Sequence, residues 1–566
     1  MDRRFVLAIV LMMAVLILPP IFLPKQKRPA PKPVATAPAT TPAAQPSVDA
    51  GPGTTPTRLT ADLPEAVVED SIEVTSPLYR YTFSTRGGRL VAARLEGYQS
   101  MRPDEKGQTA QFLRPESDFL TLALLVGRDT IPLRNVAFSA PTREVQVGAE
   151  GASLELTASV DSLIGVDLRY RFVPTDYRIE VSGRVRGLGP TGGTLLVGLG
   201  PGLRNTESDS VEHSRELGVV TKDTRSNLTR FTDLKPGEGK VLAGPFEWVG
   251  VKSKYFVAAL LAPDTTRASG GRIGGVQATA TDRVRSTPET ADLWASLTVG
   301  GDGALGYSLY IGPMEYPRLK AIGYGFDDIN PYGWAWLRPV IRPVAVGARW
   351  LLVWLHEQLG LAYGLGLVVF GVLIRLVLWP LNQKAMRASM AMQAIQPTLK
   401  EIQDKYKNDP QRLQQEMFKL YKENNVNPFS GCWPVLLPWP ILIALFFVFQ
   451  NSIELRGQAF LWVPDLSRAD PLYIIPIVMA GSMYAVTKIG QIGLPPNPQM
   501  KMMLYFMPIM MLVLFLKFAA GLNLYYAVQN LASIPQQWLV AKERMRKASL
   551  TGVVPPPAPP KGSGKK

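Results

Sequence analysis

The sequence predicts a multi-pass α-helical membrane protein that carries an all-β domain outside the membrane. Two observations lead to this fold class. Six long apolar segments are present, one at the start of the chain and five crowded into its last third. Between the first and the second segment lie residues 25–360, which are mostly polar and in which apolar and polar side chains alternate over short runs.

The apolar segments approach the length that an α-helix needs to cross a bilayer. At a rise of 1.5 Å per residue, one span takes roughly 20 residues. The first segment begins with basic residues, but no small-residue cleavage site follows, so we expect an uncleaved anchor. The sequence therefore predicts six spans, at residues 1–24, 361–381, 433–453, 473–488, 502–518 and 521–540.

Lysine and arginine in the short loops predict the orientation of these spans. Residues 382–432 contain eight of them and the tail 542–566 contains seven, whereas residues 454–472 contain two. Both basic regions and both termini are therefore expected in the cytoplasm, with the large polar region outside. Basic residues just after the first segment favour the opposite orientation there. We give more weight to the five later spans, because an odd number of spans places the outer region and the C-terminus on opposite sides of the membrane.

The outer region divides into a tether, a β domain and a connector. Residues 25–57 are rich in proline and alanine, which is typical of an extended linker. From 58 to 318 the pattern has period two, as in Tyr79, Tyr81 and Phe83, and glycine or proline separates the runs. This pattern predicts a β-sandwich. Residues 319–360 form a connector that ends in an amphipathic helix, expected in the membrane interface.

The composition argues against an enzyme. One cysteine and two histidines, Cys432, His213 and His356, cannot build the usual His/Cys metal clusters, and no P-loop spacing is present. We therefore expect no metal, no cofactor and no catalytic residue. Much of the net charge of +15 lies beside apolar segments, so it indicates membrane topology rather than binding to DNA.

Polar side chains inside the predicted spans mark the candidate site, because charge in a bilayer is costly. Arg375 lies about 9 Å inside the cytoplasmic end of its span, and Gly371 and Asn382 share its helix face. Two polar stripes can line a wet groove, and ordinary hydrogen bonding between helices is the alternative. The second stripe recurs at steps of three or four in the last span: Asn523, Tyr526, Asn530, Ser533 and Gln537.

The cytoplasmic regions add two further expectations. Residues 382–432 predict a charged helical hairpin in which Asp409 is the N-cap and Pro410 the first residue of the second helix. The basic tail binds anionic lipid or ribosomal RNA in one interpretation, and is solvated chain that only enforces topology in the other.

Three stretches in the last third of the chain resemble the YidC/Oxa family of membrane protein insertases. They read GVLIRLVLWPLNQKA, YKENNVNPFSGCWPVLLPWPI and FMPIMMLVLFLKFAAGLNLYYAVQNLASIPQQ. In the outer domain, WVGVKSKYFVAALLAP, LYIGP and YGWAWLRP are similar to Gram-negative YidC. The resemblance implies a bacterial inner-membrane protein with a periplasmic β-supersandwich and a five-helix insertase core around a hydrophilic groove.

The resemblance also implies a function, site residues and partners. The family inserts membrane proteins and helps them fold, without ATP hydrolysis. Arg375 matches the family's groove arginine, and Tyr526, Trp439 and Leu442 match positions that contact substrate. Gly371 and Pro438 depart from positions where the family often has a hydroxyl and a polar residue. The implied partners are nascent membrane proteins, the Sec translocon, the ribosome and membrane lipids.

Two other functions remain open on the residues alone. A secondary transporter or channel is expected to show inverted repeats, and the five core spans show none. A membrane-anchored enzyme requires a catalytic constellation in the β domain, and no set of side chains there stands out.

Overall fold

The computed structural model describes most of the chain after residue 68. The predicted anchor, the linker and the end of the tail lie outside the described residues. The described ranges are 69–114, 117–234, 239–262, 273–280, 290–330, 337–383, 395–407, 409–424, 439–493 and 498–550.

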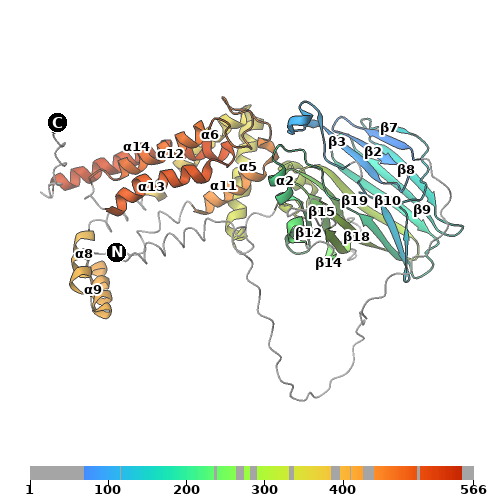
Figure 1. Ribbon diagram of the computed structural model, residues 1–566, viewed down its shortest axis with the longest axis horizontal. Helices are drawn as coiled ribbons and strands as arrows, with labels where there is room; N and C mark the ends of the chain where they lie inside the picture. Colours follow the sequence, from blue (N-terminus) through green and yellow to red (C-terminus); the bar gives the residue numbers. More distant parts are fainter. Residues whose placement is uncertain are drawn as a thin grey trace, which may run out of the picture. The chain divides into compact units, whose positions relative to one another are not determined.

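The described part of the outer region contains three β-sheets (Figure 1). The first has the order β4 (Thr109–Gln111), β3 (Leu90–Gln99), β2 (Tyr79–Ser84), β1 (Ser71–Thr75) and β7 (Glu144–Gln146). The second has the order β13 (Ser226–Arg230), β12 (Gly218–Lys222), β15 (Trp248–Lys252), β16 (Phe256–Leu261), β19 (Ala304–Pro313), β10 (Arg178–Arg186), β9 (Gly165–Phe172) and β8 (Ala152–Ser159). The third has the order β14 (Gly239–Phe246), β17 (Ile273–Ala280), β18 (Ala291–Val299), β11 (Gly193–Gly198), β5 (Leu122–Val126) and β6 (Asp129–Pro132).

Strand β2 shows how the alternating pattern produces this architecture. Successive side chains of a strand point to opposite faces, so Tyr79, Tyr81 and Phe83 share one face. All three are fully buried, as the sequence predicts, and the rings of Tyr79 and Tyr81 stack with centroids 4.1 Å apart. After β2 the chain turns through Gly87, whose φ is +77°, a conformation that favours glycine. Side chains from all three sheets contribute to one apolar core.

The described C-terminal region is helical (Figure 1). Its longer helices are α5 (Arg338–Leu359), α6 (Tyr363–Val377), α11 (Trp439–Asn451), α12 (Ile474–Gly490), α13 (Pro498–Phe515) and α14 (Ala520–Leu550). Helix α14 packs along both α12 and α6, α11 packs on α5, and α13 packs on α12. A short helix, α4 (Tyr316–Ile322), lies between the last strand and α5.

The structure does not confirm the predicted number of six spans. Within the described ranges, no helix combines the length and the apolar composition required to cross a membrane. Helix α6 ends at Val377, before the predicted end of its span. Helix α14 continues to Leu550, ten residues beyond the predicted end at 540, and its last turns carry Lys542, Arg544 and Arg546.

The hairpin predicted for residues 382–432 is described in part, as α8 (Gln396–Lys405) and α9 (Pro410–Glu423). The Oδ1 atom of Asp409 accepts a hydrogen bond from the backbone N–H of Arg412 (3.1 Å), and Pro410 begins the helix. The predicted N-cap and first helical residue are therefore confirmed. Ile395 and Leu420 are buried between the two helices.

Candidate functional site

Arg375, the arginine of the predicted span 361–381, lies where α6 meets α14. Arg375 occupies the last turn of α6 and is partly buried. Its Nη2 donates a hydrogen bond to Oε1 of Gln536 on α14 (2.8 Å). The ion pairs of the described residues do not include Arg375, so its positive charge has no carboxylate beside it there.

Gln536 holds this arginine in a fixed position. Its side-chain N–H donates to the backbone carbonyl of Trp379 (3.1 Å), and the residue is only 1% exposed. The amide thus bridges the guanidinium and the backbone of Trp379, two residues after the end of α6. Because an amide is neutral, it orients Arg375 without cancelling its charge. The Nε of Arg375 is buried and finds no acceptor among the described residues, so donor capacity remains for another group.

Gln536 belongs to a polar row that the sequence reasoning missed. Tyr525, Gln529 and Gln536 recur at steps of four and seven, which also places them on one face of a helix. Gln529 Nε2 lies 2.8 Å from the hydroxyl oxygen of Tyr525, to which it donates. This periodicity was visible in the sequence, but it lies about 90° around α14 from the predicted stripe, whose steps are shorter.

The predicted stripe on α14 contacts α12 and α13 instead of Arg375. Asn523 is fully buried, and its side chain donates to the carbonyl groups of Phe515 (3.0 Å) and Phe518 (3.4 Å) at the end of α13. Asn530 donates to Oγ of Ser482 on α12 (3.2 Å). The hydroxyl of Ser533 donates to the backbone carbonyl of Asn530 (2.6 Å) and is buried.

The remaining residues of the stripe follow the same side of α14. The ring of Tyr526 stands perpendicular to that of Phe515, with centroids 5.4 Å apart, and its hydroxyl is buried without a partner among the described residues. The Oε1 atom of Gln537 lies 3.2 Å from the place that a Cβ atom would take on Gly490 of α12. The structure therefore brings Arg375 together with Gln536 and places the predicted stripe on the neighbouring face.

The other predicted site residues lie on α6, just after α6, or on α11. A Cβ atom on Gly371 would lie 3.0 Å from Cγ1 of Val528, so glycine permits the close approach of α6 and α14. Asn382 is partly buried, and its backbone N–H donates to the carbonyl of Leu378 (2.9 Å). Leu442 is partly buried on α11, and Trp439 begins that helix, with its side chain outside the described set.

Two protein families match this chain. The family described as "60Kd inner membrane protein" matches residues 354–548, which include α6 and most of α14. The family described as "YidC periplasmic domain" matches residues 71–341, which include all three sheets. The chain is thus an inner-membrane protein whose β-rich domain is periplasmic.

Individual relatives are similar in sequence to this chain over most of its length. The membrane protein insertase YidC of Chlorobaculum parvum is 31% identical over 536 residues, which cover 88% of this chain and 87% of the relative. The insertase YidC of Syntrophus aciditrophicus is 29% identical over 566 residues, which cover 96% of this chain and the whole of the relative. A crystal structure of an active YidC insertase covers 84% of this chain and 93% of its own, at 16% identity and a TM-score of 0.34.

Because that TM-score is low, the assignment rests on the sequence matches. They cover both the helical region that holds Arg375 and the β-rich region before it. The relatives are insertases rather than enzymes, which agrees with the expectation from composition. This chain belongs to the YidC family of membrane protein insertases.

Proposed function

We propose that this protein inserts segments of nascent membrane proteins into the inner membrane and helps them fold. The observation that carries the proposal is the environment of Arg375. Its guanidinium is partly buried, is oriented by a neutral amide, and has no carboxylate partner among the described residues. A positive charge held in this way is available to an acidic group that arrives from outside the protein.

The energetics of insertion show what such a charge can do. Burial of an apolar helix in lipid drives the process, at roughly 0.8 kcal/mol per CH₂ group. The polar flank that must cross supplies the barrier, since one charge at the centre of a span costs about 2.5–3.5 kcal/mol on insertion scales. Hydrogen bonds and an opposite charge from Arg375 lower that barrier for an acidic flank. No ATP hydrolysis enters this mechanism.

In the proposed arrangement, a hydrophilic groove between α6, α11 and α14 is open to the cytoplasm and to lipid. Leu442 and Trp439 on α11 and Tyr526 on α14 contact the incoming helix as it moves into the bilayer. Gly371 on α6 and Asn382 after it complete the walls, and the polar row Asn523, Asn530, Ser533 and Gln537 supports α14 behind the groove through its contacts with α12 and α13. Six spans then place both termini in the cytoplasm.

The proposed partners follow from the remaining parts of the chain. The cytoplasmic hairpin receives the nascent polypeptide, and the basic tail helps to hold the ribosome. The Sec translocon cooperates in the insertion of larger substrates, and membrane lipids receive the released helix.

The proposal is tested by comparing substrates that differ only in the charge of the translocated flank. In reconstituted proteoliposomes, Arg375→Ala is expected to reduce insertion of the acidic substrate about tenfold more than that of the neutral one, equivalent to about 1.4 kcal/mol. Arg375→Lys retains the charge and should retain most of the preference. Lys488→Ala removes an exposed cation at the end of α12 and is the control. Equal loss for both substrates would refute the role of Arg375.

A further inference from the structure

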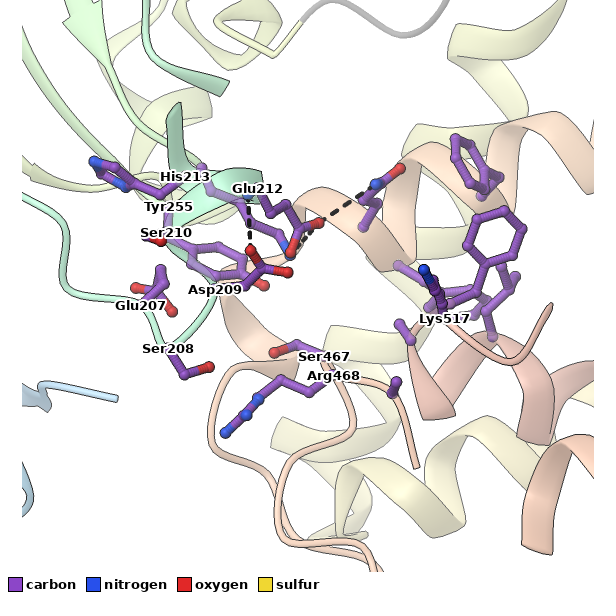
Figure 2. A pocket seen from close by; sticks show the side chains of 18 residues that line it. Glu207, Ser208, Asp209, Ser210, Glu212, His213, Tyr255, Ser467, Arg468 and Lys517 are labelled. Atoms are coloured by element: carbon purple, nitrogen blue, oxygen red, sulfur yellow. Dashed lines mark hydrogen bonds and ion pairs between the residues drawn. The ribbon is translucent and has the colours of Figure 1, made fainter. Parts of the chain in front are cut away.

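A cavity of about 420 Å³ lies where the periplasmic domain meets the ends of the core helices (Figure 2). One wall comes from the segment around the short helix α2 (Ser210–Glu216). The opposite walls come from α11, from the loop before α12 and from the turn between α13 and α14. The volume is within the usual range for a small-molecule site.

The wall from the periplasmic domain is polar and carries three carboxylates, Glu207, Asp209 and Glu212. Asp209 caps α2, since its Oδ1 accepts hydrogen bonds from the backbone N–H groups of Val211 and Glu212. Glu212 pairs through Oε1 with Lys254 (2.9 Å). Asp209 and Glu212 are thus each anchored through one oxygen, and their second oxygens make no contact of this kind with the described residues.

The buried lysine of this wall keeps its charge. Burial alone would lower the pKa of Lys254, but the neighbouring Tyr255 and Glu212 outweigh it and raise that pKa above its ordinary value. The positive charge of Lys254 is therefore balanced by the carboxylate of Glu212. Glu207 is likewise paired, with Nε of Arg456 (2.9 Å).

Two further cations line the cavity from the core side. Arg468 lies in the loop before α12 and Lys517 follows α13, and both are exposed. The ion pairs of the described residues include neither of them. Figure 2 shows Lys517 across the cavity from α2 and Arg468 below it, with Ser467 beside Arg468 and the charged ends of the two cations pointing apart.

The third wall is apolar and aromatic. Phe446 and Phe449 come from α11, Phe518 from the turn between α13 and α14, and Leu522 from the first turn of α14. The rings of Phe446 and Phe518 meet edge to face with centroids 5.5 Å apart. These helix ends adjoin the periplasmic domain, so the apolar wall lies on the periplasmic side of the core.

We propose that this cavity binds the headgroup of a zwitterionic phospholipid of the outer leaflet. The phosphate is held between Arg468 and Lys517, whose exposed side chains turn toward it on binding and which have no partner ion in the described chain. The ammonium group faces the free carboxylate oxygens of Asp209 and Glu212. One acyl chain leaves along the Phe446, Phe449 and Leu522 wall.

The balance of charge selects this class of lipid. The three carboxylates and the three cations Lys254, Arg468 and Lys517 leave the lining near neutrality. A headgroup that carries both signs is complementary to such a lining, whereas an anionic headgroup without an ammonium leaves the carboxylate wall unmatched. The proposal concerns a resident lipid and is independent of the role of Arg375.

The test uses the full chain in proteoliposomes with a trace of phosphatidylethanolamine that bears a photoreactive group on its acyl chain. Irradiation is expected to label peptides that contain residues 446–449 or 518–522. The double variant Arg468→Gln/Lys517→Gln should reduce this labelling about tenfold, as expected for loss of charge-assisted contacts to phosphate. The pair Arg468→Lys/Lys517→Arg keeps the charges and should keep the labelling.

Two comparisons separate this site from general contact with lipid. Lys488→Gln/Lys501→Gln removes two exposed cations from α12 and α13 away from the cavity and should leave the labelling unchanged. A phosphatidylglycerol probe with the same photoreactive chain should label these peptides several-fold less. Unchanged labelling in the Gln double variant, equal labelling by both lipids, or crosslinking of this cavity to a substrate polypeptide in place of lipid would each overturn the proposal.

Discussion

Arg349 on α5 and Glu454, three residues after α11, form an ion pair that is almost completely buried. Their side chains are 7% and 10% exposed, and Nη2 of Arg349 lies 2.8 Å and 3.0 Å from the two carboxylate oxygens. The same Nη2 donates to the carbonyl of Met314 (3.0 Å), just after β19. Glu454 also accepts from the backbone N–H of Tyr316 (3.2 Å). The pair therefore joins α5, the end of α11 and the last strand of the periplasmic domain.

Removal of one partner of this pair is expected to be costly. Glu454→Ala leaves the Arg349 charge buried without its counter-ion, which typically costs about 3–5 kcal/mol of unfolding free energy. Denaturant unfolding of the purified protein in detergent measures this loss. Glu155→Ala is the matched control, because its pair with Arg169 is exposed on both sides, and it should change stability little. Similar losses for both variants would contradict the inferred importance of the buried pair.

The hydrogen bond between Arg375 and Gln536 predicts a change in substrate choice. Gln536→Glu keeps the shape of the side chain but places a carboxylate 2.8 Å from the guanidinium. The charge of Arg375 is then neutralised within the protein, so insertion of substrates with acidic flanks should fall several-fold, while that of neutral substrates stays near its original level. The paired insertion assay used for Arg375→Ala reads out this difference.

The neighbouring residue provides the control for this substitution. Gln537→Glu introduces the same charge one position along α14, on the face that contacts Gly490 of α12. It should affect acidic and neutral substrates alike. If both glutamate variants gave the same selectivity, the contact with Arg375 would not be the cause.

Asn523 is expected to act through stability. Its amide donates to the carbonyl groups of Phe515 and Phe518 where α13 ends, and the Phe515 carbonyl also accepts from the backbone N–H of Phe518. Asn523→Ala removes these hydrogen bonds in a buried place and should lower the unfolding free energy by about 1–3 kcal/mol. The ratio of acidic to neutral insertion should remain unchanged. A shift in that ratio at unaltered stability would instead make Asn523 a substrate contact.

These cases show how far sequence periodicity reaches. It predicts which side chains share a helix face, as the contacts of Asn523 and Asn530 on one side of α14 illustrate. It does not say which neighbouring helix that face meets, because the rotation of a helix is decided by packing against its neighbours. Gln536 and Gln537 are adjacent and chemically identical, and only the packed structure assigns Arg375 to the first. In β2, by contrast, the alternation alone predicted which side chains are buried, because a strand has only two faces.

Gly371 determines whether α6 can approach α14 closely enough for the Arg375 contact to form. A Cβ atom there would lie 3.0 Å from Cγ1 and 3.4 Å from Cβ of Val528, so Gly371→Leu must push the two helices apart. Overpacking of this kind typically costs about 1–3 kcal/mol, and the displacement should also break the hydrogen bond to Gln536. Both stability and the preference for acidic substrates are therefore expected to fall. Gly481→Leu on α12 is the control, because no atom of another helix in the described ranges lies within 4 Å of its Cβ position. A Gly371→Leu protein with unaltered stability and selectivity would show that the close approach of these helices is not required.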